Sequence, residues 1–299
     1  MNLHFENVNL NSNSGPNSFA NKLYNHLPNI GVSVDRQKKA DAYLCFIESG
    51  KVSFSRPMFQ RLDGIYFNTD SDYNSQNKNI KRTYDMADGV IFQSEFNKNL
   101  ISRYFGEHKN HIIIHNGADL STIEKSPVLE FDKYENLWCC AASWRPHKRL
   151  SDNIRYFLEH SRKNDGLMIA GSVNSVDIYR HDRIHYLGNL KQSQLYSLYK
   201  KSKYFLHLAW LDHCPNVVAD ARASGCQIIC SSTGGTKEIA GSNAIIIQEE
   251  KWDFKPVKLY SPPRMDFSKK TYVEGNSELD MLEVAKKYKD FIENDLVRF

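Results

Sequence analysis

Short apolar runs alternate with segments of helical periodicity along most of the chain. This alternation is typical of strand–helix units around a mostly parallel sheet, so we predict an α/β fold. Strands are expected at residues 1–8, 42–47, 64–68, 89–93, 111–115, 137–142, 166–170, 183–187, 204–209 and 227–231. Helices are expected at residues 17–27, after Ser94, and at 148–159, 193–201, 216–224 and 277–299. In the first of these helices, Phe19, Leu23 and Leu27 recur every fourth residue and would form its apolar face.

A charged, proline-containing stretch at residues 121–135 interrupts the pattern, and strands and helices then start afresh. We therefore predict two domains, residues 1–132 and 133–277. The terminal helix, at about residues 278–299, is expected to return to the first domain. Residues 252–276 contain three prolines and no clean period, so we predict an ordered excursion over the surface.

Composition bounds the function without fixing it. The chain has 299 residues, of which 41% are hydrophobic and 12% aromatic, enough for packed cores. The net charge of +4 is mild and the Lys and Arg residues are dispersed, so nucleic acid is not an expected partner. We see no membrane span or secretory signal, and the six cysteines form no CxxC pair, which favours a cytoplasmic location. Peripheral contact with the inner membrane face stays open.

The segment Asp212-His-Cys-Pro-Asn-Val-Val-Ala-Asp220 places two acids around a predicted helix start. Pro215 suits the first helical position, and the first turn would offer the N–H groups of Asn216 and Val217 to an anion. Asp220 would lie on the same face of the helix. A phosphate site between two carboxylates fits a sugar nucleotide. The alternatives are a helix-dipole charge at Asp212 and a solvent-facing residue at Asp220.

Five motifs occur in an order and spacing that match a known family. They lie at residues 141–149, 167–171, 184–188 with 195–199, 212–220 and 232–238. Together they resemble the C-terminal domain of retaining glycosyltransferases of family 4, and residues 90–106 and 116–119 resemble segments of that family's first domain. The resemblance implies the GT-B architecture, two Rossmann-like domains facing across a cleft. It also implies transfer of a hexose from a nucleoside-diphosphate sugar to an acceptor hydroxyl, on a glycan or lipid-linked glycan, with retention of configuration.

The resemblance assigns roles to individual residues. Lys148 and Arg145 would stabilise the departing diphosphate, although a basic turn that caps a helix has the same sequence. Asp212 would lie near the transferred hexose, and Asp220 would hold the ribose hydroxyls. Both are Asp where the family usually has Glu, so each reaches one methylene less far. The family also spaces its Arg and Lys more widely, which makes Arg149 an alternative to Arg145.

Other candidates are less specific. Gly234 and Gly235 permit a close backbone approach to the donor, or simply form a turn between a strand and a helix. Gly15 precedes the first helix, where the family carries a glycine-rich loop, and a plain helix-starting turn is the alternative. Arg61 and Asp63 are candidates for contact with the acceptor, and a salt-linked turn is the alternative.

The motifs give no reason to expect a metal ion or a cofactor. His207, His213, Cys214 and Cys226 lack the spacing of a zinc site, and we expect them to pack strands or line the cleft. Neither a GxGxxG nor a P-loop motif is present. Two other functions stay open: a non-catalytic nucleotide-sugar or glycan-binding protein, and a sugar-nucleotide epimerase of the same architecture.

Overall fold

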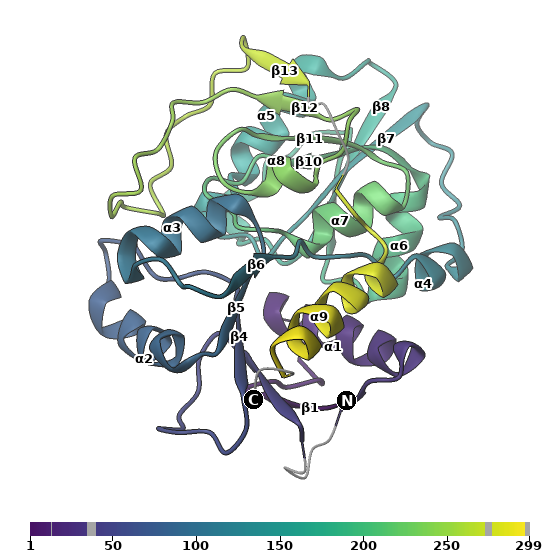
Figure 1. Ribbon diagram of the computed structural model, residues 1–299. Helices are drawn as coiled ribbons and strands as arrows, with labels where there is room; N and C mark the ends of the chain where they lie inside the picture. The colour runs from purple at the N-terminus through teal and green to yellow at the C-terminus, as the bar shows by residue number, and fades with distance from the viewer. Residues whose placement is uncertain (13, 35–39, 273–276, 297–299) are drawn as a thin grey trace. The chain divides into compact units, whose positions relative to one another are not determined.

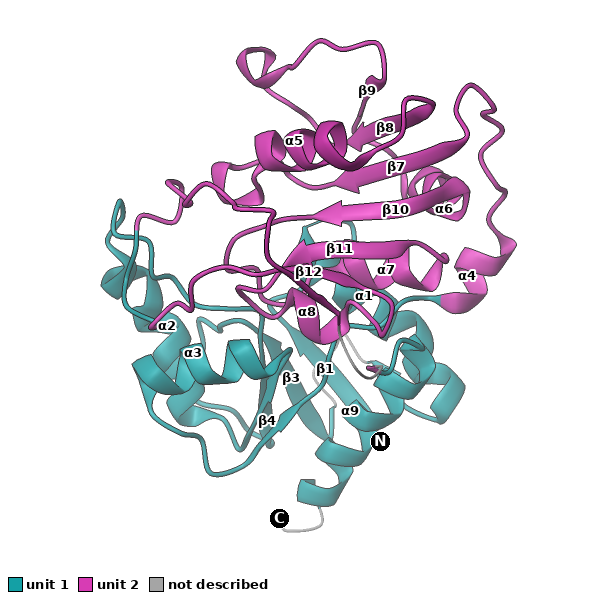
Figure 2. Ribbon diagram, turned by 90° about the horizontal axis from the view of Figure 1, so that it is seen from above, with its two compact units in different colours: residues 1–119, 254–257, 278–299 teal, residues 120–253, 258–277 magenta. Residues whose placement is uncertain are grey.

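The computed structural model describes residues 1–12, 14–34, 40–272 and 277–296 (Figure 1). The chain forms two compact units (Figure 2). Unit 1 comprises Met1–Asp119, Phe254–Val257 and Glu278–Phe299, and unit 2 comprises Leu120–Asp253 and Lys258–Ser277.

The units divide at Asp119, earlier than the predicted boundary at residue 132. The charged stretch that we took for the end of the first domain packs on unit 2. There, Lys200 Nζ donates to the carbonyl oxygens of Glu124 and Ser126 at 3.0 and 2.6 Å, and Leu129 N donates to Ser197 O at 3.2 Å. These hydrogen bonds attach the stretch to unit 2, which its polar composition alone could not reveal.

Unit 1 is built on a six-stranded parallel sheet with the order β2-β1-β3-β4-β5-β6. Its strands are β1 (Asn2–Glu6), β2 (Ser33–Val34), β3 (Ala42–Phe46), β4 (Met58–Leu62), β5 (Gly89–Phe92) and β6 (His111–Ile113). Its helices are α1 (Gly15–His26), the 3₁₀ turn η1 (Leu27–Ile30), α2 (Tyr73–Met86), α3 (Glu95–Phe105) and α9 (Met281–Leu296).

The terminal helix returns to unit 1, as predicted. In Figure 1, α9 lies beside α1. Tyr288 and Ile292 of α9 are buried in one cluster with Phe19 of α1 and with Leu3 and Leu44 of the sheet. The apolar face of α9 therefore completes the main core of unit 1, because it covers the strands next to α1.

One predicted strand of unit 1 is wrong, and helix α2 and the short strand β2 were not predicted. The strand expected at residues 64–68 is instead β4, Met58–Leu62. Its pattern was hidden because Gln60 and Arg61 are polar, although both are buried. Helix α2 was not predicted, since few apolar residues mark it; its buried positions include Asn77 and Thr83.

Unit 2 is built on a seven-stranded sheet with the order β13-β12-β11-β10-β7-β8-β9, parallel except for β13. Its strands are β7 (Asn136–Ala141), β8 (Asp165–Ala170), β9 (Ile184–Gly188), β10 (Ser202–His207), β11 (Gln227–Ser231), β12 (Ile245–Ile247) and β13 (Lys270–Tyr272). Its helices are α4 (Leu120–Lys125), η2 (Pro146–Lys148), α5 (Leu150–His160), η3 (Ser175–Asp177), α6 (Gln192–Lys201), α7 (Asn216–Ala223) and α8 (Thr236–Ile239).

Helices cover both faces of this sheet. Trp138 of β7 packs against Phe157 of α5, with ring centroids 5.7 Å apart. On the other face, Phe205 of β10 packs against Tyr199 of α6 at 5.3 Å. Met265 and Phe267 are buried with the α5 face, so residues 252–276 are not only the surface excursion that we predicted. Residues 273–276 of that segment lie outside the described residues.

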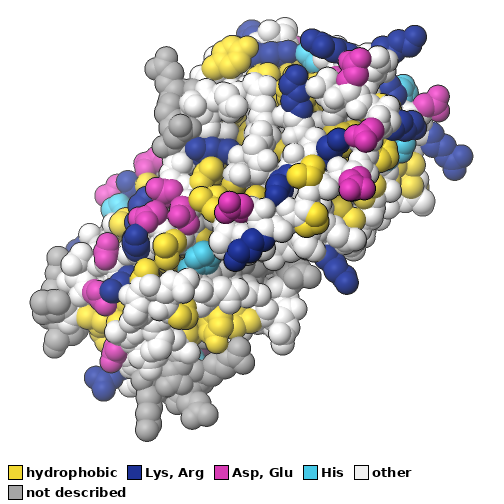
Figure 3. Space-filling view, turned by 90° about the vertical axis from the view of Figure 1, so that its right-hand side faces the viewer, with side chains coloured by type: hydrophobic (Ala, Val, Ile, Leu, Met, Phe, Trp, Pro, Cys, Tyr) yellow, Lys and Arg dark blue, Asp and Glu magenta, His cyan; other side chains and the backbone are white. Residues whose placement is uncertain are grey.

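The surface drawn in Figure 3 carries Lys and Arg side chains interspersed with Asp and Glu. Among the helices formed by the described residues, none is both long and apolar enough to span a bilayer.

Candidate functional site

The strongest candidate site lies at the carboxyl edge of the sheet in unit 2. Strands β7, β10 and β11 are neighbours and run parallel, so the loops that follow them leave from one edge. Open α/β sheets bind ligands at this edge. The loop after β7 leads to Lys148, the loop after β10 carries Asp212, and the loop after β11, residues 232–235, is called the glycine loop below.

An ion pair joins two of these loops. Lys148 Nζ lies 2.5 Å from Asp212 Oδ2, and His207 Nε2 lies 2.8 Å from the same oxygen. The N–H of His213 donates to Asp212 Oδ1 at 3.0 Å. Burial alone would raise the pKa of Asp212, but the ammonium of Lys148 and the hydrogen bond from His207 outweigh it and hold that pKa well below its usual range. Asp212 is therefore an ionised hydrogen-bond acceptor.

The histidines around this pair are neutral at pH 7. Burial and the charge of Lys148 lower the pKa of His147 to about 3, and burial lowers the pKa of His213 to about 4. Burial also lowers the pKa of His207, against the hydrogen bond to Asp212. A neutral His207 donates to the carboxylate when its Nε2 carries the proton. The positive charge at this edge therefore comes from Lys148 and Arg145 rather than from imidazolium.

The glycine loop packs against the backbone of Asp212. Gly234 has a φ of +85°, and a Cβ built on it would lie 2.4 Å from the carbonyl oxygen of Asp212. The N–H of Gly235 donates to that oxygen at 2.8 Å. A side chain at position 234 would push the two loops apart, so the glycine is required by close approach as well as by backbone conformation.

Helix α7 carries the remaining donor-site candidates. It begins at Asn216. Pro215 was predicted as the first helical residue, but it is the N-cap and has an extended backbone. The N–H groups of Val218 and Ala219, the third and fourth helical residues, donate to the carbonyl oxygen of Pro215 at 3.0 and 3.4 Å. The N–H groups of Asn216 and Val217 thus precede the helical ladder. Asp220 is only 8% exposed, which contradicts the solvent-facing alternative.

The two arginines beside Lys148 differ sharply. Arg145 is exposed at the N-cap of η2, where its charge contributes to the lowered pKa of His147. Arg149 is buried, and its guanidinium forms an ion pair with Glu249 at 2.6 Å. The idea that Arg149 could replace Arg145 at the donor is therefore wrong, because its charge is already engaged inside unit 2.

In unit 1, the side chain of Arg61 is buried and held by three polar contacts. Its side chain is 1% exposed and donates to Asp63, to Asn116 Oδ1 at 2.7 Å and to the hydroxyl of Tyr288 at 3.0 Å. The salt-linked alternative is the one that the geometry fits, at the end of strand β4. Asp63 is 16% exposed and also accepts from Gln93 Nε2 at 3.0 Å; burial raises its pKa in spite of Arg61.

Gly15 is the first residue of α1, after the N-cap Ser14. A Cβ built on it would meet no atom of the described chain within 4 Å. Close packing within the described chain therefore does not require glycine at this position.

Two residues of the site were not predicted from the sequence. We assigned His207 to strand packing, yet it donates to Asp212. A polar residue at the end of an apolar strand, five positions before the acid, is the signal that could have revealed it. Glu249 belongs to no motif, and only the fold brings it to Arg149.

A metal site is expected to bring together three or more His, Cys, Asp or Glu side chains. Among the described His, Cys, Asp and Glu residues, no such group is found.

Comparison with known proteins gives a family match over part of the chain and several similar structures. Residues 122–254 match the family described as Glycosyl transferases group 1. No curated protein sequence matches the chain. The structure is similar to Alr3699/HepE from Anabaena in complex with UDP and glucose, with a TM-score of 0.67 at 12% identity over 98% of this chain and 100% of that one. It is similar to AviGT4, a glycosyltransferase involved in avilamycin A biosynthesis, with a TM-score of 0.65 at 11% identity over 100% and 99%.

A third similar structure is the sucrose-phosphate synthase of Thermosynechococcus elongatus, with a TM-score of 0.62 at 11% identity over 84% of this chain and 86% of that one. These likenesses establish the fold. The two Rossmann-like units form the GT-B fold, which confirms the predicted fold class, and the match to Glycosyl transferases group 1 covers residues 122–254, less than half of the chain. The family match supports a sugar-transfer function.

Proposed function

We propose that the protein is a retaining glycosyltransferase of the family 4 type. It would transfer a hexose from a nucleoside-diphosphate sugar to a hydroxyl group of a glycan or lipid-linked glycan. One observation carries the proposal. Lys148, Asp212 and the glycine loop converge at the carboxyl edge of the sheet within the glycosyl transferases group 1 domain.

Lys148 and Arg145 would hold the diphosphate. The leaving nucleoside diphosphate gains negative charge as the glycosidic bond breaks, and fixed cations stabilise this charge more than the ground state. Lys148 is held in place by Asp212 before any ligand arrives. The N–H groups of Asn216 and Val217 would bind phosphate oxygens at the start of α7, and the backbone of Gly234 and Gly235 would approach the donor closely.

The two acids would hold the hydroxyl groups of the donor. Asp212 would accept a hydrogen bond from the hexose, and Asp220 would accept from the ribose. Because the pKa of Asp212 is well below its usual range, Asp212 carries no proton to donate and is a weak base. We propose that the acceptor oxygen attacks the anomeric carbon while the bond to the phosphate oxygen breaks, and that the acceptor proton passes to the leaving phosphate.

In this proposal, Lys148 and Arg145 supply the positive charge at the diphosphate, and no divalent cation is required. Turnover should therefore be unchanged when EDTA is added. Loss of turnover in EDTA that is restored by a divalent cation would contradict this part of the proposal.

The donor is identified by turnover. Purified protein is incubated with UDP-, GDP-, dTDP- and ADP-sugars, and release of the nucleoside diphosphate is quantified. One donor is expected to be consumed, and when an acceptor alcohol is added, NMR of the glycoside formed should show the anomeric configuration of the donor. Nucleotide binding without turnover would favour a nucleotide-sugar-binding protein, and inversion would refute the retaining mechanism.

A further inference from the structure

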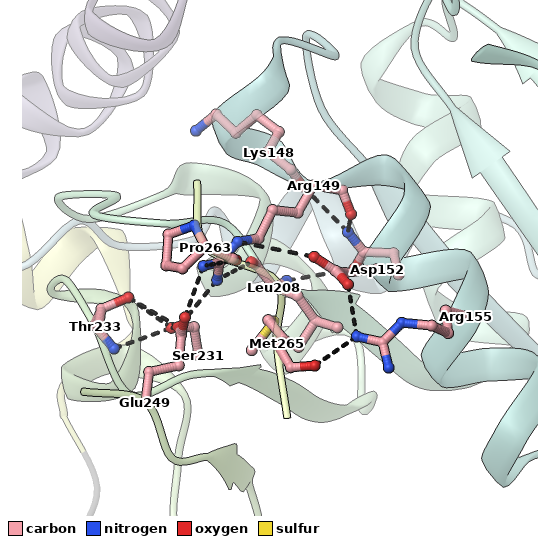
Figure 4. A network of polar contacts seen from close by, with 11 residues as sticks. Lys148, Arg149, Asp152, Arg155, Leu208, Ser231, Thr233, Glu249, Pro263 and Met265 are labelled. Carbon is pink, nitrogen blue, oxygen red and sulfur yellow. Dashed lines mark hydrogen bonds and ion pairs between the residues drawn. The ribbon is translucent and has the colours of Figure 1, made fainter. Parts of the chain in front are cut away.

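Two adjacent basic residues leave the turn between η2 and α5 in opposite directions. Lys148 Nζ contacts Asp212. Figure 4 shows that Arg149 points away from the Lys148 side chain and toward Glu249. The two side chains diverge because the backbone of Arg149, with a φ of +52° and a ψ of +52°, lies in the left-handed region. Residues other than glycine adopt this conformation only when the surrounding structure holds it.

Buried contacts hold Arg149 in this conformation. Its guanidinium makes a bidentate ion pair with Glu249, with N–O distances of 3.0 and 2.6 Å. It also donates to the carbonyl oxygens of Pro263 at 2.9 Å and Leu208 at 3.4 Å. The side chains of Arg149 and Glu249 are only 1% and 7% exposed. Leu208 opens the loop that carries Asp212, so Arg149 already touches a second loop of the site.

Glu249 extends the network to the glycine loop. Its carboxylate accepts from the hydroxyl of Ser231 and from the hydroxyl of Thr233 at 3.1 Å. Its own N–H donates to Ser232 Oγ at 2.9 Å. Ser231 ends β11, and Thr233 directly precedes Gly234. One buried carboxylate therefore fixes the start of the glycine loop and also holds Arg149, the neighbour of Lys148.

From this network we infer that Arg149 and Glu249 are positioning residues for diphosphate recognition. The ion pair couples the turn that carries Lys148 to the glycine loop, so the cation and the backbone groups that meet the diphosphate keep one fixed geometry. This inference rests on the proposed function, because it assigns the pair to the donor site proposed above. A merely structural ion pair would stabilise unit 2 without any preference among nucleotides.

The two roles are separated by comparing nucleotides with and without the second phosphate. Dissociation constants for UDP, GDP, dTDP and ADP, and for the four matching nucleoside monophosphates, are measured by calorimetry on the wild type and on Glu249→Gln. The variant keeps the shape of Glu249 and removes its charge. We expect diphosphate affinity to fall about tenfold, because small displacements of positioned groups are costly, while monophosphate affinity changes by less than about threefold. An equal change in both affinities would overturn the inference.

Three further variants sharpen the test. Arg149→Gly keeps a backbone suited to the left-handed turn but loses the ion pair, so its preference for diphosphate over monophosphate should fall as in Glu249→Gln. An Arg149→Gly protein that keeps the wild-type preference would overturn the inference. Arg155→Gln is the matched control, since it breaks a neighbouring pair, with Asp152 at 2.7 Å, and should keep the wild-type preference. Ser231→Ala removes the hydroxyl that donates to Glu249 and should shift the diphosphate preference in the same direction. It replaces Glu249→Gln in the test if that variant does not fold.

The two proposals fail in different ways. If the wild type binds none of UDP, GDP, dTDP and ADP, the proposed donor site is wrong and the inference falls with it. If the wild type prefers the diphosphate and all three network variants keep that preference, the donor site stands and only the positioning role is refuted.

Discussion

Replacing Lys148 by methionine should destabilise unit 2 before any ligand is considered. The change removes the ammonium that lies 2.5 Å from Asp212 Oδ2 and leaves a carboxylate that is only 14% exposed. Removing one partner of a buried ion pair costs roughly 3–5 kcal/mol. Because His207 and the N–H of His213 still donate to Asp212, the lower end applies, and we expect a loss of about 3 kcal/mol.

This loss can be measured in unit 2 alone. The chain has four tryptophans, Trp138, Trp144, Trp210 and Trp252, and all four belong to unit 2. Thermal unfolding followed by tryptophan fluorescence at pH 7 should show a midpoint lowered by about 6–12 °C, at roughly 2–4 °C per kcal/mol for a unit of this size. The double variant Lys148→Met with Asp212→Asn should recover part of the loss, because no unpaired charge remains.

The pH dependence gives the same prediction a second test. The pKa of Asp212 is lowered in the folded protein, so its ionised form contributes stability above the ordinary carboxyl range, and that contribution is lost as the pH falls through the lowered pKa. The wild type should therefore lose its advantage over Lys148→Met in acid. A midpoint within about 1 °C of the wild type at pH 7, or a difference that grows in acid, would refute the reasoning.

Three other predictions follow from buried contacts. Gly234→Ala should lower the unfolding free energy by about 1–3 kcal/mol and weaken nucleotide binding, whereas Gly15→Ala, with open space around it, should be neutral or stabilising by circular dichroism. Arg61→Met should lower the free energy of unfolding in urea by roughly 3–5 kcal/mol, because it leaves Asp63 buried without its cation. A loss below about 1 kcal/mol, the value of an exposed ion pair, would count against the buried network. The six cysteines are free and buried, so a thiol reagent should label none in the native protein and all six in urea; rapid native labelling would contradict this burial.

Much of the donor-site hypothesis could be predicted from the sequence, because residues that directly follow parallel strands meet at one edge of the sheet. Lys148, Asp212 and Gly234 each follow a recognisable strand, and parallel strands end at one edge, so their convergence could be expected. The contacts of Glu249 could not be predicted from the sequence, and for His207 the only signal was a polar residue at the end of an apolar strand. Whether a polar side chain at a strand end packs or donates depends on distant residues that only the fold brings near.

The same limit explains the errors. Strand β4 was missed because Arg61 and Gln60 look exposed in a sequence, yet Arg61 is buried by partners as far along the chain as Tyr288. Arg149 looked interchangeable with Arg145 because both flank the same short turn. A left-handed backbone at Arg149, supported by the carboxylate of Glu249 from the loop after β12, sends the two side chains to different places.

The measurement that tests the central claim most directly is the turnover number of Lys148→Ala with the donor that the wild type consumes. It is compared with the wild type and with Lys203→Ala, an exposed lysine on β10, as the matched control. Loss of an electrostatic contact to a leaving group costs about 10²–10³ in turnover, so we expect nucleoside diphosphate release to fall at least a hundredfold in Lys148→Ala and to be unchanged in Lys203→Ala. Release by Lys148→Ala at the wild-type rate would contradict the assignment of the donor site to this edge of unit 2.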